Sequence, residues 1–379
     1  MASDGVRDPH AAVPESNRAK AYSRIKLAIG IASSLISFGL LVVFIATGWT
    51  RVLATWCTDR VGNDYLALIA FAACLGALQL AFTLPLSWYA SYHVEHAFGL
   101  SNQSVGRWIS ERVKGFAISM PFVLCVLCIL YFSLRSFGAQ WWIPVASVLV
   151  LLSMLLTWVA PLVIMPIFYR FTPIDEGPLR RRIALLCEKA GMHFDGIFSF
   201  NMSKNTKKAN AGFTGIGRSK RIILGDTLLQ EFTEEEIETV FAHELGHYRF
   251  GHIRKAVVLG TISTFLGLFI TSWLYDVSLK VFGFGSRTDL AAMPLLAIGV
   301  SLFGLFTSPI GNMISRKHEW EADAYAVQHT GKRGAFASAL RRLAAMNLAD
   351  PEPHPLVEFL FYSHPSIGKR IKALEQREP

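Results

Sequence analysis

Six long apolar stretches constrain this chain more than any other feature. None of them contains Asp, Glu, Lys or Arg, and they cover residues 27–48, 65–90, 116–134, 142–168, 256–275 and 290–314. A run of roughly 20 apolar residues is long enough to cross a bilayer, and a helix is the form that satisfies its backbone there. The sequence therefore predicts a mainly α, polytopic membrane bundle with about six spans.

Composition agrees with a membrane protein. Hydrophobic residues make up 52% of the 379 residues and charged residues only 17%, which is unusual for a soluble domain. The net charge of +9 is explained by basic loops and an anionic lipid surface. We therefore expect the lipid bilayer, and no nucleic acid, as a partner. Uncharged spans also argue against an ion or metal transporter, which needs ionisable groups at membrane depth.

Basic residues predict the orientation of the chain. Lys and Arg are frequent in the connections 1–26, 91–115, 169–255 and 315–379 and rare in 49–64, 135–141 and 276–289. Six crossings place both termini on one side, and the positive-inside rule makes that side the cytosol. The five cysteines show no disulfide spacing, so no structural disulfide is expected.

These boundaries divide the chain into five regions. We expect a flexible cytosolic tail, a four-span membrane region, a cytosolic segment, a membrane hairpin and a C-terminal cytosolic helical segment, at 1–26, 27–168, 169–255, 256–314 and 315–379.

The cytosolic segment is expected to combine helices with a small sheet. Pro178 and Gly191 bound a helix over about 178–190. Short β-like runs follow at 196–200, 209–213 and 221–224, with turns at Gly215, Gly217 and Ser219. An edge strand of such a sheet can bind an extended peptide by main-chain hydrogen bonds. A purely structural hairpin is the alternative.

A metal-binding pattern follows this sheet. Residues 243–247 read His-Glu-Leu-Gly-His, and two histidines four residues apart lie on one helical face, where they can bind one Zn²⁺. Thr233 and Glu236 form a capping-box pattern that predicts the start of this helix. Glu244 lies beside the two histidines, where it can accept a proton from an attacking water. An amphipathic helix with two surface histidines is the simpler alternative.

A catalytic zinc site needs a third protein ligand and an open position. Glu319 is the best candidate, at the start of a helix predicted on the same membrane side and ending near Gly331. Asp323, one turn on, can accept the free N–H of a ligating histidine. The remaining alternatives for the third ligand are Glu321, His318 and His252. On a continuous helix His252, five residues beyond His247, would be rotated away from the ligand face, so it is expected at the surface or at a helix end.

Such a ligand set predicts hydrolysis by activated water. Glu244 would take the water proton and deliver it to the leaving amine. The developing oxyanion needs a further donor, for which His364 and Arg370 are candidates, although a helix-cap histidine and a surface arginine are the simpler readings. A non-catalytic membrane scaffold with structural zinc is the alternative from another class. It would need a fourth Cys or His, and no cysteine lies nearby.

Several further motifs, taken in order, resemble one family. They are residues 99–103 (GLSNQ), 171–173 (FTP) with Gly177, Asn210-Ala211, 220–224 (KRIIL), 226–229 (DTLL), 243–247, Ser315-Arg316, Glu319, Ala322-Asp323, and 363–365 (SHP) with Arg370. From about residue 66 to the C-terminus the chain resembles the type I CAAX prenyl proteases, integral-membrane zinc endopeptidases that cleave isoprenylated substrates.

This resemblance implies roles for particular residues. It implies one Zn²⁺ per chain held by His243, His247 and Glu319, with Glu244 as the catalytic base and Asp323 supporting a ligand. Asn210 and Ala211 would belong to a substrate-binding edge strand, while His364 and Arg370 would contact the substrate carbonyl or the oxyanion.

The resemblance also implies a fold and a substrate class. The fold would be a zincin-like helical metalloprotease domain closing a ring of membrane helices around a chamber. The substrate would be a peptide or protein that carries a prenyl group. A short Gln230-Glu231-Phe232 before the zinc helix, and no additional first span, indicate a bacterial-type member in the inner membrane; a eukaryotic member would lie in the endoplasmic reticulum. A quality-control zinc protease without a prenyl requirement is the alternative, and the oligomeric state is left open.

Overall fold

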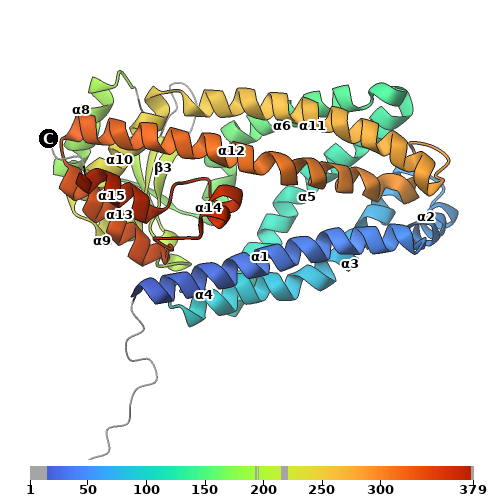
Figure 1. Cartoon of the computed structure of the whole chain (residues 1–379), viewed down its shortest axis with the longest axis horizontal. Helices are drawn as coiled ribbons and strands as arrows, with labels where there is room; N and C mark the ends of the chain where they lie inside the picture. The colour runs from blue at the N-terminus through green and yellow to red at the C-terminus, as the bar shows by residue number, and fades with distance from the viewer. Residues whose placement is uncertain (1–14, 193, 195, 215–220, 377–379) are drawn as a thin grey trace, which may run out of the picture.

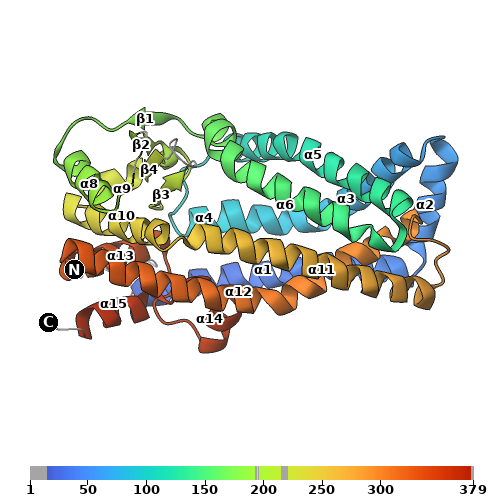
Figure 2. The same ribbon diagram turned by 90° about the horizontal axis from the view of Figure 1, so that it is seen from above.

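Long helices running along the longest axis of the molecule dominate the structure, a computed structural model that describes residues 15–192, 194, 196–214 and 221–376 (Figure 1). A small sheet and short helices gather at one end, and α2 (Trp49–Arg60) lies at the other. The view in Figure 2, turned by 90°, shows the same separation of the two ends. The fold is therefore a membrane bundle with a compact domain at one end, as predicted.

Within the described residues, six helices are long and apolar enough to cross a membrane. They are built around α1 (Glu15–Ala46), α3 (Asp64–Trp88), α5 (Val105–Ser136), α6 (Trp142–Val159), α11 (His252–Phe282) and α12 (Met293–Thr330). The prediction of about six spans is confirmed. Short segments extend or join them, namely η1 (Tyr89–His93), α4 (Val94–Ala97), η2 (Gly138–Gln140), η3 (Ala160–Ile164), α7 (Met165–Phe168) and η6 (Leu290–Ala292).

Two predicted boundaries are wrong because helices continue through them. Residues 15–26, expected in the flexible tail, form the first turns of α1, and Lys26 pairs with Glu95 at 3.0 Å. The membrane span at 290–314 and the helix carrying Glu319 are one 38-residue helix, α12. The residues that follow the apolar span include no Pro or Gly before Gly331 and favour helix formation, so α12 continues beyond the end of the apolar stretch. Residues 1–14 of the expected tail, and the turns expected at Gly215, Gly217 and Ser219, lie outside the described residues.

In the part of the chain that the structure describes, the sheet has four strands in the order β1-β2-β4-β3. They are β1 (Phe171–Pro173), β2 (Gly196–Phe200), β3 (Ala211–Thr214) and β4 (Arg221–Gly225). β2 and β4 pair in parallel, whereas β1 and β3 pair antiparallel to them at the two edges. The three predicted strands are confirmed, and β1 is an additional one.

A hydrophobic core joins the sheet to the surrounding helices. Ile183, Ile222, Phe241 and Phe336 are almost completely buried in it. They come from α8 (Pro178–Lys189), β4, α10 (Glu234–Arg249) and α13 (Arg333–Asn347). The remaining elements are η4 (Met202–Lys204), α9 (Asp226–Glu231), α14 (Pro355–Phe361) and α15 (Ile367–Gln376). Burying each large apolar side chain stabilises the fold by about 1.5–3 kcal/mol, so this core holds α10 firmly.

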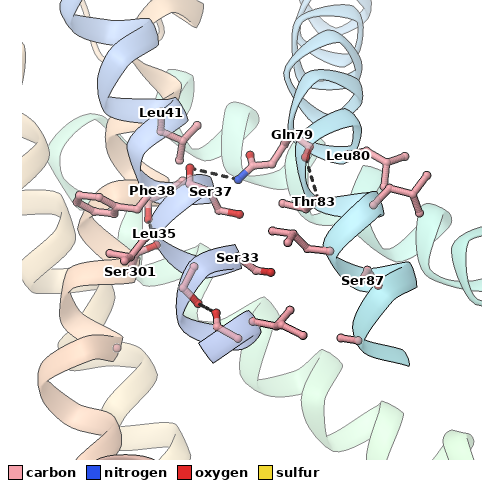
Figure 3. Close-up of a pocket in the computed structure, with 18 of the residues that line it drawn as sticks. Ser33, Leu35, Ser37, Phe38, Leu41, Gln79, Leu80, Thr83, Ser87 and Ser301 are labelled. Carbon is pink, nitrogen blue, oxygen red and sulfur yellow. Dashed lines mark hydrogen bonds between the residues drawn. The ribbon is translucent and has the colours of Figure 1, made fainter. Parts of the chain in front are cut away.

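A cavity of about 2040 Å³ lies among the long helices (Figure 3). Its lining comes from α1, α3, η1, α5 and α12, and it includes polar side chains such as Ser33, Gln79, Thr83 and Ser301. Gln79 donates a hydrogen bond to the carbonyl of Ser37 at 3.3 Å, which ties α3 to α1 across the lining. The volume exceeds that of a typical small-molecule pocket, roughly 300–1,000 Å³.

Candidate metal centre

Helix α10 holds the predicted histidine pair on a fixed frame. The predicted capping box is present: the Thr233 hydroxyl accepts from the Glu236 N–H at 3.3 Å, and the Glu236 carboxylate accepts from the Thr233 N–H at 2.9 Å. One helical face then presents His243 and His247, whose Nε2 atoms lie 3.2 Å apart.

Gly246 lets α10 approach α12 closely. A Cβ placed on Gly246 would lie 2.9 Å from the Cα of Ala322 and 3.1 Å from the Cβ of Tyr325. Contacts below 3.0 Å would force the helices apart. The glycine between the two histidines therefore allows α12 to bring its carboxylates to them.

Three side chains converge at this contact. The Glu319 carboxylate lies 3.4 Å from His243 Nε2 through Oε2 and 3.2 Å from His247 Nε2 through Oε1. Together these residues could hold a metal ion. Glu319 Oε2 is buried and makes no hydrogen bond of good geometry. Its nearest donors, His243 Nε2 at 3.4 Å and Arg370 Nη1 at 3.5 Å, lie at the limit of hydrogen-bond length, so a bound cation would satisfy this oxygen better than they do. Two imidazole nitrogens and a carboxylate oxygen are ligands that suit zinc.

The alternatives to Glu319 do not join the group formed by His243 and His247. Glu321, His318 and His252 form a separate group whose potential ligand atoms lie within 4.8 Å of one another. Glu319, the candidate favoured from the sequence, is thus the carboxylate that the fold brings to the histidine pair.

A buried charge network supports His243. Its Nδ1 lies 2.7 Å from Asp323 Oδ1, and Asp323 also accepts from Arg370 Nε at 2.8 Å and Nη2 at 2.6 Å. Burial lowers the pKa of His243, but the neighbouring carboxylates of Asp323 and Glu319 outweigh it and raise that pKa to about 9. The surroundings of this imidazole therefore favour positive charge, as a metal cation would supply.

Glu244 lies between the two histidines in the sequence and is partly buried. Burial raises the pKa of its carboxyl, although His243 and His247 act in the opposite direction. A carboxylate with a raised pKa is better matched to accepting a proton near neutral pH.

The two predicted oxyanion donors occupy different places. The exposed His364 lies at the edge of the centre, with Nε2 3.3 Å from Glu319 Oε1. Arg370 is buried and donates hydrogen bonds from Nε and Nη2 to Asp323. Its Nη1 lies 3.5 Å from Glu319 Oε2. The exposed side chain of His364 is accessible to an approaching ligand, whereas the guanidinium of Arg370 already contacts the carboxylates of Asp323 and Glu319.

The predicted peptide-binding residues lie on an edge strand. Ala211 begins β3, which pairs only with β4 among the described strands, and Asn210 precedes it with an exposed side chain. The Asn210 carbonyl accepts from the Gly225 N–H at 2.9 Å. On the side away from β4, no described strand pairs with β3.

The prediction for His252 is confirmed only in part. The residue begins α11, as expected for a helix-end residue, but it is only 5% exposed and its Nδ1 lies 2.9 Å from His247 Nδ1. The spacing of a continuous helix, which would turn His252 away from His247, does not apply here. Helix α10 ends at Arg249, and Gly251 takes a left-handed conformation with φ 66°. Gly251 in the sequence was the available signal for this break.

Family models match nearly the whole chain. That of peptidase family M48 matches residues 173–378. The model of the CAAX prenyl protease N-terminal region, with five membrane helices, matches residues 11–170.

Known proteins match over similar lengths. An uncharacterized metalloprotease of Bacillus subtilis, YhfN, is 31% identical over 365 residues, which cover 95% of this chain and 85% of that protein. CAAX prenyl protease 1 of Saccharomyces cerevisiae is 33% identical over 335 residues, covering 81% and 72%. The crystal structure of Ste24p from S. mikatae matches with a TM-score of 0.86 at 27% identity, covering 98% of this chain and 92% of that one. The chain therefore belongs to peptidase family M48 and is an integral-membrane metalloprotease closely related to the CAAX prenyl proteases.

Proposed function

We propose that the protein is a zinc-dependent endopeptidase whose metal is held by His243, His247 and Glu319. The observation that carries this proposal is the convergence of the three side chains beside Glu244, with the buried Glu319 Oε2 reached only by long contacts from His243 and Arg370. When zinc is bound there, it supplies a Lewis acid that polarises the scissile carbonyl and lowers the pKa of water in the open position.

The neighbouring side chains divide the remaining work. Glu244 accepts the proton of the attacking water and delivers it to the leaving amine. His364, exposed at the edge of the centre, donates to the substrate carbonyl as negative charge develops on its oxygen. The contacts of Arg370 favour a positioning role, in which it holds Asp323 against His243, over direct contact with the substrate.

We further propose prenylated peptides as substrates. The support is the relatives named CAAX prenyl protease, together with a large cavity that has both apolar and polar lining. Ser308 in the cavity lining and Glu319 lie on the same helix, 11 positions or about 16 Å apart. A lipid chain in the cavity and a peptide strand paired with the free edge of β3, at Asn210 and Ala211, would meet near the metal.

The distribution of basic residues supports a proposal for the membrane and the orientation of the chain. We propose the bacterial inner membrane, or the endoplasmic reticulum in a eukaryote, with the metal centre facing the cytosol. The support is the excess of Lys and Arg in the connections at the sheet end of the molecule.

One experiment tests the reaction and the substrate class together. Detergent-purified protein is given matched prenylated and unprenylated peptides, with and without a chelator, and product masses are measured. We expect cleavage of the prenylated peptide that the chelator stops and added zinc restores. Cleavage unaffected by the chelator contradicts the metal mechanism. Equal rates on both peptides contradict the prenyl requirement alone.

Glu244→Ala tests the assigned base. We expect it to abolish cleavage while zinc remains near one equivalent per chain, because the three ligands are intact. Zinc content is measured by mass spectrometry on the same sample as activity. Retained turnover would show that another group moves the proton.

A further inference from the structure

A second group of polar side chains lies directly behind the proposed metal centre. It consists of His252 at the start of α11, and His318 and Glu321 on α12. His252 Nδ1 lies 2.9 Å from His247 Nδ1, and His252 Nε2 lies 2.9 Å from Glu321 Oε2. His252 therefore connects a proposed zinc ligand to a carboxylate on the neighbouring helix.

The backbone places His252 there through one glycine. Gly251, with φ 66°, separates α10 from α11 and turns the chain so that the next residue faces back toward His247. His252 is 5% exposed, and buried polar rings of this kind need hydrogen-bond partners. His318 covers one face of the ring, with centroids 4.0 Å apart and planes at 10°.

The hydrogen bonds fix one arrangement of protons if the proposed function holds. His247 Nε2 faces His243 and Glu319 at 3.2 Å each, so this nitrogen must carry the lone pair that a metal binds. Its Nδ1 then carries the proton and donates to His252 Nδ1. His252 in turn carries its proton on Nε2 and donates it to Glu321.

We propose that His252, oriented by Glu321, is the positioning residue for the zinc ligand His247. It accepts the Nδ1 proton of His247, as Asp323 does for His243. A partner of this kind fixes the tautomer and orientation of a ligating imidazole, and its loss weakens metal binding by roughly 10- to 100-fold. This inference rests on the proposed zinc function.

The geometry favours this arrangement over a second metal site. His252 already uses both ring nitrogens, toward His247 and Glu321. The rings of His252 and His318 are nearly parallel and stacked, so their lone pairs lie in separate parallel planes. Lone pairs in parallel planes do not point at one shared ion.

The test measures zinc affinity by competition with a chelator on full-length protein in detergent. His252→Phe keeps an aromatic ring but removes the acceptor, and we expect zinc to bind roughly 10- to 100-fold more weakly. His252→Gln, which retains an acceptor oxygen, should recover part of the loss. Thermal unfolding of each variant checks that the fold is intact.

Glu321 and His318 provide a second variant and a control. Glu321 is one-third exposed, so Glu321→Ala should fold even if His252→Phe does not, and it should also weaken zinc binding. Glu321→Gln, still an acceptor, should stay closer to wild type. His318→Phe keeps the stacked ring and should leave zinc affinity unchanged.

Three results would overturn the inference. Wild-type affinity in both His252→Phe and Glu321→Ala removes the positioning role while leaving the proposed function intact. Two zinc equivalents in wild type, with one lost in His318→Phe, would show a metal at the second group. A wild-type protein that binds no zinc overturns the proposed function and this inference together.

Discussion

At the scale of single residues, the pairing of Asp323 with Arg370 is the most consequential contact beside the metal centre. Both side chains are buried, at 5% and 8% exposure. Two hydrogen bonds of 2.6 and 2.8 Å join them, and the same carboxylate reaches His243. Such a pair adds little net stability, but removing one partner leaves an uncompensated buried charge.

Single and double substitutions at this pair should not be additive. We expect Asp323→Ala or Arg370→Met alone to lower the free energy of unfolding by about 3–5 kcal/mol. The double variant should lose clearly less than the sum, because neither member of this pair is left buried without the other. Denaturant unfolding in detergent measures all three. Additive losses would mean that the two residues act independently.

The sequence predicted the converging residues but not all of their supports. His243, Glu244 and His247 follow from helical spacing, and Glu319 and Asp323 from a second motif whose spacing of four residues also puts them on one face. The contact of His252 with His247 was not predicted, because the five-residue offset assumes one continuous helix, whereas the chain breaks at Gly251. The two hydrogen bonds from Arg370 to Asp323 depend on how α15 packs against α12, and no local sequence pattern predicts that packing.

At the scale of elements, the contact between α10 and α12 decides whether the centre forms. Gly246 is the point of closest approach, since an added Cβ would lie 2.9 Å from the Ala322 Cα. Backbone cannot move aside as a flexible side chain can. The distance between His247 and Glu319 is therefore set by the absence of a side chain at this position.

Gly246→Ala should weaken both the fold and metal retention. Overpacking of this kind costs about 1–3 kcal/mol of stability, and pushing the helices apart should raise the zinc dissociation constant. Thermal unfolding and chelator competition measure the two effects. Gly260→Ala on α11, which has no neighbouring atom within 4 Å, is the matched control and should equal or exceed wild-type stability. Equal stability and equal zinc affinity of the Gly246→Ala and Gly260→Ala variants would contradict the close approach of α10 to α12 at Gly246.

Elements were predictable where a pattern is local. The capping box at Thr233 and the strands at 196–200 and 221–225 follow from short-range signals. The continuity of α12 was not predicted. Hydropathy falls after residue 314, which suggests the end of a helix, but the helix continues to Thr330. β1 was missed because its three residues gain stability only by pairing with β2.

At the scale of the whole molecule, the chain is a bundle whose sheet and proposed metal centre lie at one end. The first turns of α1, the sheet, α10 and α15 all lie at that end (Figure 1). Apolar lengths predicted the six spans. They did not predict the cavity of about 2040 Å³, because a void depends on how far apart helices pack and leaves no periodic trace in the sequence.

Reporter fusions test the proposed orientation. A fluorescent protein that matures only in the cytosol, fused to the C-terminus, should be active in bacterial cells. A phosphatase that is active only outside the cytosol should be inactive at the same point and active when inserted after Gly285, in the exposed loop at the opposite end. The reverse pattern would place the metal centre outside the cytosol.

Anomalous diffraction at the zinc edge, on crystals of the active protein, tests the central claim most directly. We expect one peak, about 2.0–2.2 Å from His243 Nε2, His247 Nε2 and a Glu319 carboxylate oxygen. No peak at these three side chains in a catalytically active crystal, or a peak ligated by His252, His318 and Glu321 instead, would contradict the account.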